Sequence, residues 1–407
     1  MAVSVDTAIE LISNINTKQD FEIIPIEDSL NRICAQDVYA TSSLPRYNNS
    51  AMDGYAIICE DKDEELEVID TIFAGDDNTT LIEKNTCIKI MTGARIPQNA
   101  TAVVPKEDTE KLDDNKIKIN TNVREFQHIR FIGEDIKEED LLVNKGDEIN
   151  FAKITLFASQ GISHIKVYRK PKIVVFASGE ELKLHYEKIE PHQIYNSNTP
   201  TFIARAQELG CDVTFIGQAK DSIEAIQELI KNSLDADLII TSGGVSVGEA
   251  DFTKAAFNEL HFETIFEGII IKPGKPTVFG KIGNCFILNL PGNPLASAMI
   301  FEMFGKLILQ KLLNSNETNH NYIETKIDED LSNKAGRVTL LPGFFDGSKF
   351  TVSQKRSPGM VSVLSSCNAL LALDENVSQI KKDSNVKILP INWKFFTNEK
   401  KDFLTYE

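Results

Sequence analysis

A glycine-rich segment that directly follows an apolar run is the part of the sequence best suited to bind an anion. The run Leu238–Thr241 leads into residues 242–251, which read Ser-Gly-Gly-Val-Ser-Val-Gly-Glu-Ala-Asp. Glycines let backbone N–H groups approach a phosphate closely, and the amino terminus of a following helix adds a positive dipole end. The segment indicates a phosphate-binding loop. A plain glycine-rich turn fits the same residues, and the segment is neither a Gly-x-Gly-x-x-Gly nor a Walker sequence.

Charged residues near this loop point to a metal ion and a cationic pocket. Glu249 and Asp251 would repel a phosphate unless a divalent cation lay between them, and Mg²⁺ commonly joins one or two carboxylates to substrate phosphates. Further along, Lys272 and Lys275 lie in the turn Lys-Pro-Gly-Lys-Pro, where the prolines would stiffen the backbone. Their ammonium groups would supply the positive charge that an anionic ligand needs.

Two more turns contain Gly or Pro and directly follow predicted strands. Residues 290–294 read Leu-Pro-Gly-Asn-Pro, and residues 178–182 read Ser-Gly-Glu-Glu-Leu. Each alone could be a plain structural turn. All four turns would fall at strand ends, however, and open α/β sheets bind ligands at the carboxyl ends of their strands. We therefore expect the four turns to form one site.

The elements that must position these turns appear as an alternation of apolar runs and amphipathic segments after Pro171. This alternation indicates a parallel β-sheet with helices on both faces. Strands are expected over residues 172–177, 212–216, 238–241, 277–281 and 285–290, and helices over residues 200–209, 223–233, 251–260 and 295–313.

The flanking regions have a different texture. Helical spacing over residues 4–15 and 151–160 predicts two helices that pack together, the second capped by Asn150. Between them, residues 44–127 form short alternating runs separated by turns, which predicts a small β-rich domain. Past residue 321 the alternation returns and predicts a second β domain, sandwich-like or barrel-like.

The composition limits the kinds of partner. The chain has 407 residues, with 43 Lys and Arg against 60 Asp and Glu, a formal net charge of −17 and 42% hydrophobic residues. This is the composition of a folded globular protein of several domains, and so acidic a chain disfavours nucleic acid and anionic membranes as partners. We expect no transmembrane helix, because no uninterrupted apolar stretch reaches about 18 residues.

The cysteines and histidines show no spacing typical of a metal site, and the cysteines indicate a reducing compartment. The six cysteines form no Cys-x-x-Cys pair and most lie in apolar runs, which indicates free thiols in a reducing compartment. The histidines show no spacing typical of a zinc site. The amino terminus carries Asp6 and Glu10 and no Lys or Arg before Lys18, unlike a signal peptide. We therefore expect a cytoplasmic protein.

The motifs together resemble those of the molybdopterin molybdenumtransferases, the molybdenum-insertion enzymes of molybdenum cofactor synthesis, whose animal relative is the E domain of gephyrin. Any one motif is weak, but eight in order along essentially the whole chain are very specific. They are Ser-Ala-Met-Asp-Gly-Tyr-Ala (50–56), Met-Thr-Gly-Ala (91–94), Arg-x-x-Gly-Glu-Asp (130–135), Ser-Gly-Glu-Glu-Leu (178–182), Ile-Tyr-Asn-Ser-Asn (194–198), the glycine-rich segment (242–251), Lys-Pro-Gly-Lys-Pro (272–276) and Leu-Pro-Gly-Asn-Pro (290–294).

The resemblance implies four domains in an elongated homodimer. A discontinuous α+β linker or dimerisation domain would comprise residues 1–43 and 129–168, with a β-rich domain at residues 44–128 inserted into it. An α/β molybdopterin-binding domain would follow at residues 169–318, and a C-terminal barrel-like β domain at residues 319–407. Transient contact with the molybdopterin adenylyltransferase is a further expected partnership.

The resemblance also implies a reaction. Family members take adenylylated molybdopterin and molybdate, use Mg²⁺, cleave the phosphoanhydride, release AMP and leave molybdenum on the dithiolene sulfurs. Because two anions must meet, catalysis would rest on positioning, a metal ion and cationic groups. The implied substrate contacts are Gly243, Gly244, Val245, Ser246, Gly248, Lys272, Lys275, Pro291, Pro294, Ser197 and Asn198, and the implied catalytic residues are Asp53, Thr92, Glu181, Asp221 and Asp251.

The implied catalytic residues divide into two groups. Glu181, Asp221 and Asp251 would bind Mg²⁺ and position the hydrolysis. Asp53 and Thr92 would form a wall of the site that is contributed across the dimer interface. In isolation, the Asp-Gly pair that begins at Asp53 reads as an ordinary turn, so this role depends on the resemblance.

Two other functions remain open at the level of sequence. Adenylyl transfer to molybdopterin fits the glycine-loop α/β unit, but that enzyme would lack the region with residues 50–56 and 91–94. A gephyrin-like scaffold fits the family, but the chain has no long Pro/Ser-rich linker and no second pterin domain. The residues do not separate molybdate from tungstate, since both are tetrahedral dianions. The chain departs from the usual motifs at Asn99, Thr101, His128 and Glu180, and residues 357–364 match them only loosely.

Overall fold

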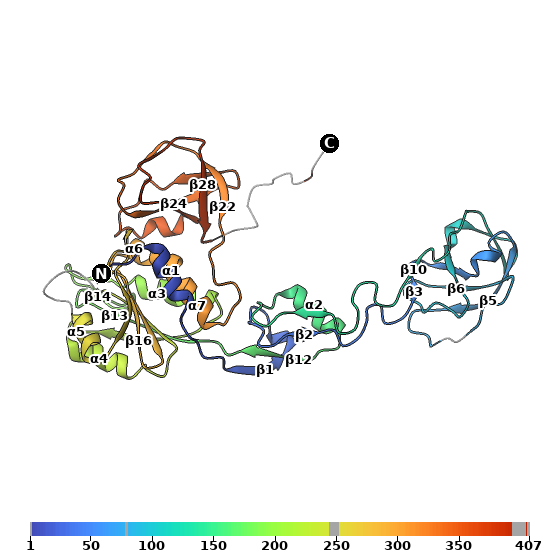
Figure 1. Cartoon of the computed structure of the whole chain (residues 1–407), viewed down its shortest axis with the longest axis horizontal. Coiled ribbons are helices and arrows are strands. Elements are labelled where there is room, and N and C mark those ends of the chain that lie inside the picture. Colours follow the sequence, from blue (N-terminus) through green and yellow to red (C-terminus); the bar gives the residue numbers. More distant parts are fainter. Residues whose placement is uncertain (1, 78–79, 244–251, 393–403, 405–407) are drawn as a thin grey trace.

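The computed structural model describes residues 2–77, 80–243, 252–392 and 404. Figure 1 shows an elongated molecule. At one end, an α/β body made of α1 and the elements from β13 to α7 lies beside a C-terminal barrel. A narrow middle body with β1, β2, β11, β12 and α2 extends from it. A distal body, made of strands β3 to β10, lies at the far end.

Six strands form the sheet of the α/β body, in the order β16-β13-β17-β21-β20-β18. Four predicted strands run parallel, but the predicted strand β20 runs antiparallel to them, and β18, for which no strand was predicted, pairs antiparallel with β20. Only Gly283 and Asn284 join β20 to β21, and so short a connection links antiparallel strands. The strands are β13 (Lys172–Ser178), β16 (Asp212–Ala219), β17 (Leu238–Ser242), β18 (Glu263–Glu267), β20 (Val278–Ile282) and β21 (Cys285–Leu290).

Helices cover both faces of this sheet, as the alternation predicted. Side chains along β17 alternate between two buried apolar clusters: Leu238 and Ile240 lie in the cluster with α3 and α7, whereas Ile239 lies in the cluster with α4 and α5. The helices are α3 (Asn198–Glu208), α4 (Ile223–Lys231), α5 (Phe252–Glu259), α6 (Pro294–Ile300) and α7 (Lys306–Leu312), and a π-helical turn at Phe301–Gly305 joins the last two.

The first helix, α1 (Val5–Ser13), packs on the α/β body. Its residues Ala8 and Ile12 are buried in the same apolar cluster as α7. The second helix, α2 (Phe151–Ser159), instead buries Phe157 among side chains of the middle body. The predicted packing of these two helices on one another is therefore wrong, because each finds its apolar partner in a different body.

Two segments far apart in the sequence form the middle body. β1 (Phe21–Pro25) pairs antiparallel with β12 (His164–Tyr168), and β2 (Val38–Tyr39) pairs antiparallel with β11 (Leu141–Val143). Asn150 caps α2 as predicted, since its side chain accepts a hydrogen bond from a backbone N–H of the first turn (3.1 Å).

The distal body is β-rich, as predicted. Its six-stranded sheet has the order β7-β4-β6-β5-β9-β8, and the pair β3 and β10 lies where it joins the middle body (Figure 1). The neighbours Cys87 and Ile88 are buried in different clusters, so both faces of the sheet are covered. The strands are β3 (Asn49–Ser50), β4 (Gly54–Ile57), β5 (Glu65–Ile72), β6 (Thr86–Ile90), β7 (Ala102–Pro105), β8 (Thr109–Lys111), β9 (Lys116–Ile119) and β10 (Ile129–Arg130).

The C-terminal strands close into a barrel, which confirms the barrel-like prediction. β24 pairs with both β25 and β26, and β22 and β28 complete the ring. β19 (Ile271–Lys272) leaves the α/β body to pair with β24, so a strand pairing joins the two bodies. The barrel strands are β22 (Ile323–Ile327), β24 (Val338–Phe345), β25 (Lys349–Val352), β26 (Ala369–Leu373) and β28 (Asn385–Pro390).

Short elements complete the fold. None of the helices in the described ranges has the length and apolar character needed to cross a membrane. The remaining strands are β14 (Leu182–Lys183) with β15 (Ile194–Tyr195) and β23 (Leu331–Ser332) with β27 (Gln379–Ile380), and 3-10 turns lie at Ile26–Asp28, Cys59–Asp61, Lys106–Asp108 and Ser362–Ser365.

Candidate active site

The carboxyl ends of three neighbouring strands meet at one edge of the α/β sheet. β17 ends at Ser242, and the backbone N–H of Gly243 donates to Leu290 O at the end of β21 (3.2 Å). A Cβ on Gly243 would lie only 2.9 Å from Ser178 O at the end of β13, and its φ of +95° also favours glycine. The three turns therefore adjoin one another. Gly244, Val245, Ser246, Gly248 and Asp251 lie outside the described residues.

Asn198 joins two of these turns from the first position of α3. Its buried side-chain amide donates to Gly292 O (2.8 Å) and to Ser242 Oγ (3.3 Å). Gly292 belongs to the turn with Pro291 and Pro294, so Asn198 fixes the spacing between that turn and the end of β17. Ser197 lies next to it at the helix start, and its carbonyl accepts a hydrogen bond from a hydroxyl in the next turn (3.0 Å).

The C-terminal barrel reaches this edge through a contact that sequence analysis missed. Pro358 O accepts hydrogen bonds from Leu295 N (2.9 Å) and Ala296 N (3.3 Å), at the first turn of α6. These are N–H groups that a helix leaves without an internal partner. The signal in the sequence was the Ser-Pro-Gly-Met stretch after residue 356, which the family motifs matched only loosely.

Two of the predicted metal ligands lie on adjoining turns. The carboxylate of Asp221 accepts a hydrogen bond from Glu180 N (3.2 Å), which ties it to the turn that carries Glu181. Gln218 Nε2 holds the same turn by donating to Gly179 O (2.6 Å). Glu181 and Asp221 are both exposed at the sheet edge. Within the described ranges no group of three or more His, Cys, Asp or Glu side chains is placed to hold a metal ion, and the third predicted ligand, Asp251, lies outside those ranges.

The lysine turn corrects one part of the sequence prediction. It follows β19, which pairs with the barrel strand β24 and not with the central sheet. Gly274 has a φ of +113°, and a Cβ there would overlap the side chain of Ile300 in α6. Thr277 Oγ1 closes the turn by donating to Gly274 O (2.7 Å). Lys272 and Lys275 are exposed on either side of this packed glycine, so the turn is fixed against α6 and its ammonium groups are accessible.

Asp53 and Thr92 lie together, but in the distal body. Asp53 Oδ1 accepts hydrogen bonds from Thr92 N (2.7 Å) and from Thr92 Oγ1 (2.8 Å). The backbone N–H and then the hydroxyl lower the pKa of the Asp53 carboxyl below its ordinary value. Asp53 directly precedes β4 and Thr92 follows β6, whereas Glu181 directly precedes β14. Figure 1 shows the distal body with β6 and the α/β body with β14 at opposite ends of the molecule. A single chain therefore keeps the two groups of predicted catalytic residues apart.

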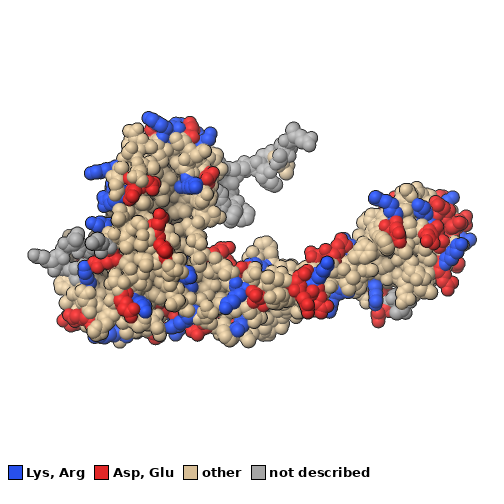
Figure 2. Space-filling model, in the orientation of Figure 1, with Lys and Arg blue, Asp and Glu red and all other residues tan. Residues whose placement is uncertain are grey.

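Acidic side chains gather away from the sheet edge. Figure 2 shows dense groups of them at the neck between the middle and distal bodies and over the distal body itself. Residues 133–140, which lie between β10 and β11, carry five acidic residues and one Lys, and residues 60–67 of the distal body carry six acidic residues and one Lys. Much of the excess negative charge thus lies apart from the turns expected to bind anions.

Three family models match consecutive parts of the chain. Residues 3–161 match the MoeA N-terminal region (domain I and II), residues 174–311 match a probable molybdopterin binding domain, and residues 324–391 match the MoeA C-terminal region (domain IV). The molybdopterin molybdenumtransferase of Haemophilus influenzae is 32% identical over 91% of this chain and 94% of its own length. The chain belongs to the molybdopterin molybdenumtransferase family.

Other relatives agree with this family assignment. The molybdopterin molybdenumtransferase of Staphylococcus epidermidis is 35% identical over 83% of this chain and 82% of its own length. The crystal structure of a molybdopterin biosynthesis moeA protein from Pyrococcus horikoshii superposes with a TM-score of 0.83, at 28% identity, over 97% of this chain and 100% of that one. As a member of a family of transferases with all three matched regions, the chain is an enzyme and has the distal region that a lone adenylyltransferase unit would lack.

Proposed function

We propose that this chain inserts molybdenum from molybdate into adenylylated molybdopterin, cleaving the adenylate in a Mg²⁺-dependent step and releasing AMP. The observation that carries the proposal is the meeting of the Ser178, Gly243 and Pro291 turns at one sheet edge, in a chain whose relatives are named molybdopterin molybdenumtransferases. Open α/β sheets bind ligands at such an edge.

In this proposal the sheet edge holds the adenylylated pterin. Gly243 brings the backbone close to a phosphate without a side chain in the way, and Asn198 keeps the neighbouring turn at a fixed distance. Lys272 and Lys275 offset the repulsion between the pyrophosphate and the incoming molybdate. Holding two anions together is the main task, so these residues act by positioning more than by covalent chemistry.

Glu181 and Asp221, with Asp251, are the proposed ligands of Mg²⁺. The donors fit this ion, because exposed carboxylates on adjoining turns beside a phosphate site are the oxygen ligands that it prefers. When bound, the ion would neutralise charge that develops on the phosphoanhydride oxygens. The hydrogen bond from Glu180 N restrains one oxygen of Asp221 and leaves the other to face a ligand.

Asp53 and Thr92 are proposed to complete the site of a partner chain in a homodimer. They adjoin β4 and β6 of the distal body, which lies at the opposite end of the molecule from the α/β body (Figure 1), so they do not reach the sheet edge of their own chain. Thr92 keeps Asp53 ionised and aimed, so the carboxylate can accept a hydrogen bond from a substrate N–H or a water molecule. We also propose transient transfer of the adenylylated pterin from the adenylyltransferase, and a cytoplasmic location. All six cysteines are free thiols, which supports a reducing compartment.

The test is AMP release from adenylylated molybdopterin and Mg²⁺, measured with and without molybdate. We expect release that depends on molybdate, with a parallel arm containing tungstate to compare the two oxyanions. Glu181→Gln should lower kcat by about a hundredfold, as expected for loss of a metal ligand, whereas the nearby exposed Glu190→Gln should not change it. Equal release with and without molybdate, or none in either, would refute the proposal. Formation of adenylylated molybdopterin from ATP would favour the adenylyltransferase alternative.

A further inference from the structure

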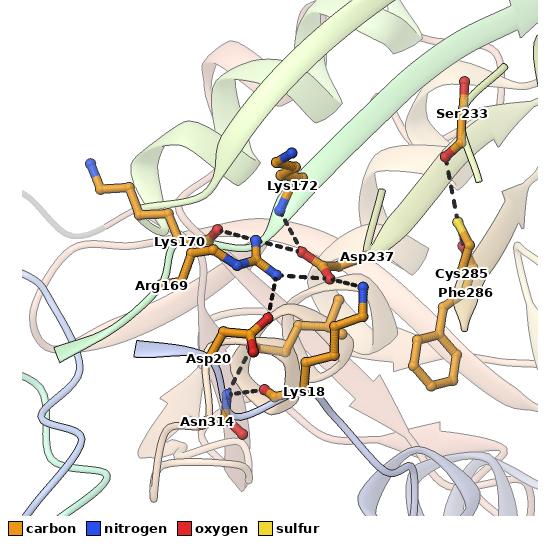
Figure 3. A network of polar contacts seen from close by, with 11 residues as sticks. Lys18, Asp20, Arg169, Lys170, Lys172, Ser233, Asp237, Cys285, Phe286 and Asn314 are labelled. Carbon is orange, nitrogen blue, oxygen red and sulfur yellow. Dashed lines mark hydrogen bonds and ion pairs between the residues drawn. The ribbon is translucent and has the colours of Figure 1, made fainter. Parts of the chain in front are cut away.

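Only two connections run between the α/β body and the middle body, and both pass the edge of the sheet opposite the candidate site. Residues 14–20 join α1 to β1, and residues 169–171 join β12 to β13. Asp237, which directly precedes β17, lies between them. Figure 3 shows Lys18 and Arg169 reaching the Asp237 carboxylate, with Asp20 and Asn314 beside them.

The Asp237 carboxylate binds both connections at once. Its Oδ1 accepts hydrogen bonds from Lys18 Nζ (3.2 Å) and Arg169 Nη2 (3.1 Å), and its Oδ2 accepts from Arg169 Nη1 (3.0 Å) and Lys172 N (2.8 Å). The side chain is only 8% exposed. Burial works to raise the pKa of Asp237, but the hydrogen bonds from Arg169, Lys172 N and Lys18 outweigh it and hold the pKa below the ordinary value.

A second set of contacts holds the first connection from its other side. Thr17 Oγ1 donates to Asn314 Oδ1 (2.8 Å), and Asn314 Nδ2 donates to Lys18 O (2.9 Å). Asp20 is 3.6 Å from the Arg169 guanidinium, so the two connections also contact each other directly. Lys18 is therefore fixed through its side chain by Asp237 and through its backbone by Asn314.

Packing alone does not fix the first connection. Residues 14–18 line a hollow of about 620 Å³ at this edge of the sheet, whose other walls include Asp237, Lys281 and Phe286. The Lys18 side chain is 43% exposed. Ile15 packs against the apolar core, and one side of the connection faces open space, so the polar contacts with Asp237 and Asn314 add a restraint on the part that follows Ile15.

We propose that Asp237 is a positioning residue that fixes the direction of the middle and distal bodies relative to the candidate site. Asp237 directly precedes β17, and Gly243 directly follows it. The contacts of Asp237 with the two connections and the proposed phosphate-binding turn therefore lie at opposite ends of one strand. Because the middle and distal bodies extend from these two connections, a small rotation at the connections displaces the distal body the most. The positions of Asp53 and Thr92 thus depend on Asp237. The catalytic consequence rests on the proposed function, whereas the geometric one does not.

The geometric test compares Asp237→Asn with Asp235→Asn, which removes an exposed carboxylate two residues earlier. Nitroxide labels are attached at Glu110→Cys in the distal body and at Glu228→Cys in α4, in a Cys59→Ser background. Pulsed EPR measures the distance between the two labels, which reports how the distal body is placed relative to the α/β body. Labelled chains are diluted into an excess of unlabelled chains so that distances within one chain dominate. We expect a broader distance distribution for Asp237→Asn and no change for Asp235→Asn. An unchanged distribution in Asp237→Asn would overturn the proposal.

The kinetic test separates positioning from substrate binding. Asp237→Asn should lower kcat for AMP release by about tenfold, because misplaced catalytic groups cost rate. It should leave the Kd for adenylylated molybdopterin unchanged, since the pterin turns lie at the other end of β17. A broader distance distribution with unchanged kcat would overturn the positioning role. If the wild-type chain releases no AMP, the proposed function fails. The EPR comparison would still show whether Asp237 fixes the direction of the middle and distal bodies.

Two further variants keep the test valid if Asp237→Asn folds poorly. Arg169→Lys keeps the charge but replaces a two-pronged contact with a single one, so it should broaden the distance distribution less than Asp237→Asn. Asp237→Glu keeps the carboxylate and should restore part of the narrow distribution and part of kcat. Equal loss in Asp237→Glu and Asp237→Asn would contradict a role for the charged contact.

Discussion

At the scale of single residues, hydrogen bonds fix the orientation of the Asp53 and Asp221 carboxylates. One oxygen of Asp53 accepts two hydrogen bonds from Thr92, and one oxygen of Asp221 accepts one from Glu180 N. For Asp53, these donors lower the pKa of the carboxyl group, so its charge persists to lower pH than that of an ordinary aspartate.

The Asp53 pair gives a prediction about pH. The pKa of Asp53 is lowered in the folded chain, so the carboxylate stays ionised to lower pH than an ordinary aspartate does. Thr92→Val removes the hydroxyl donor but keeps the backbone N–H, which makes the larger contribution. We expect the pKa of Asp53 to rise only part of the way to its ordinary value. Titration of ¹³C-labelled aspartate carboxyl groups by NMR measures this change.

Thr86→Val is the matched control for this titration. Thr86 lies in the same distal sheet, and its hydroxyl donates to Glu83 O and not to a carboxylate (2.8 Å). The pKa of Asp53 should therefore be the same in Thr86→Val as in the wild-type chain. A Thr92→Val titration that overlays the wild type would show that the hydroxyl contributes nothing to the charge of Asp53.

At the scale of elements, local patterns predicted most strands and helices, because period and turn chemistry are local properties. The strand before Gly243, the Asn150 cap and the turns at the ends of β13 and β21 all followed from neighbouring residues. The antiparallel edge of the sheet, the packing of α1 on α7 and the Pro358 contact with α6 did not. Those depend on which apolar or polar surfaces meet across long stretches of chain, and periodicity carries no information about that.

The lysine turn gives a prediction at this scale. Gly274 and Gly336 have the same φ of +113°, but a Cβ on Gly274 would overlap Ile300, whereas nothing lies within 4 Å of a Cβ on Gly336. Gly336→Ala should therefore cost only the backbone strain, about 1 kcal/mol. Gly274→Ala adds overpacking against a buried side chain and should cost about 2–4 kcal/mol in total.

The Gly274→Ala and Gly336→Ala variants are compared by calorimetry and by their affinity for adenylylated molybdopterin. The transition that includes the α/β body should shift to lower temperature in Gly274→Ala, and the affinity for adenylylated molybdopterin should fall because Lys272 and Lys275 are displaced. Gly336→Ala should bind the pterin as the wild-type chain does. Equal losses of stability in the two variants would mean that the contact with Ile300 does not hold the turn.

At the scale of the whole molecule, the elongated shape separates the two groups of proposed catalytic residues within one chain. The α/β body holds the turns proposed to bind the pterin, while Asp53 and Thr92 adjoin β4 and β6. Figure 1 shows that these strands belong to the distal body at the far end of the molecule. The sequence could indicate which bodies exist, but not their directions. Those depend on contacts that join residues far apart in the chain. Asp237, Asn314 and Asn316 make hydrogen bonds between the bodies, and Ile33, Ala35 and Tyr168 pack in the core of the α/β body. In the proposed homodimer, a second copy of the chain would supply the wall of the site formed by Asp53 and Thr92.

Sharing of the site between chains is tested by complementation. Asp53→Asn and Glu181→Gln should each be inactive as homodimers. In a heterodimer of the two, purified through two different tags, one site combines an intact Glu181 with an intact Asp53 from the other chain, and the second site lacks both. Such a heterodimer should have about half of the wild-type activity per dimer, because a two-fold dimer has two equivalent sites.

A second heterodimer shows whether recovery depends on where the residues lie. Glu181→Gln paired with Asp221→Asn should not recover, because both residues belong to the same sheet edge and each site then has one defect. If Asp53 instead served its own chain, the first heterodimer would also fail, since each chain would have a damaged site. Recovery in the first pair and none in the second would therefore assign the distal body of one chain to the sheet edge of the other.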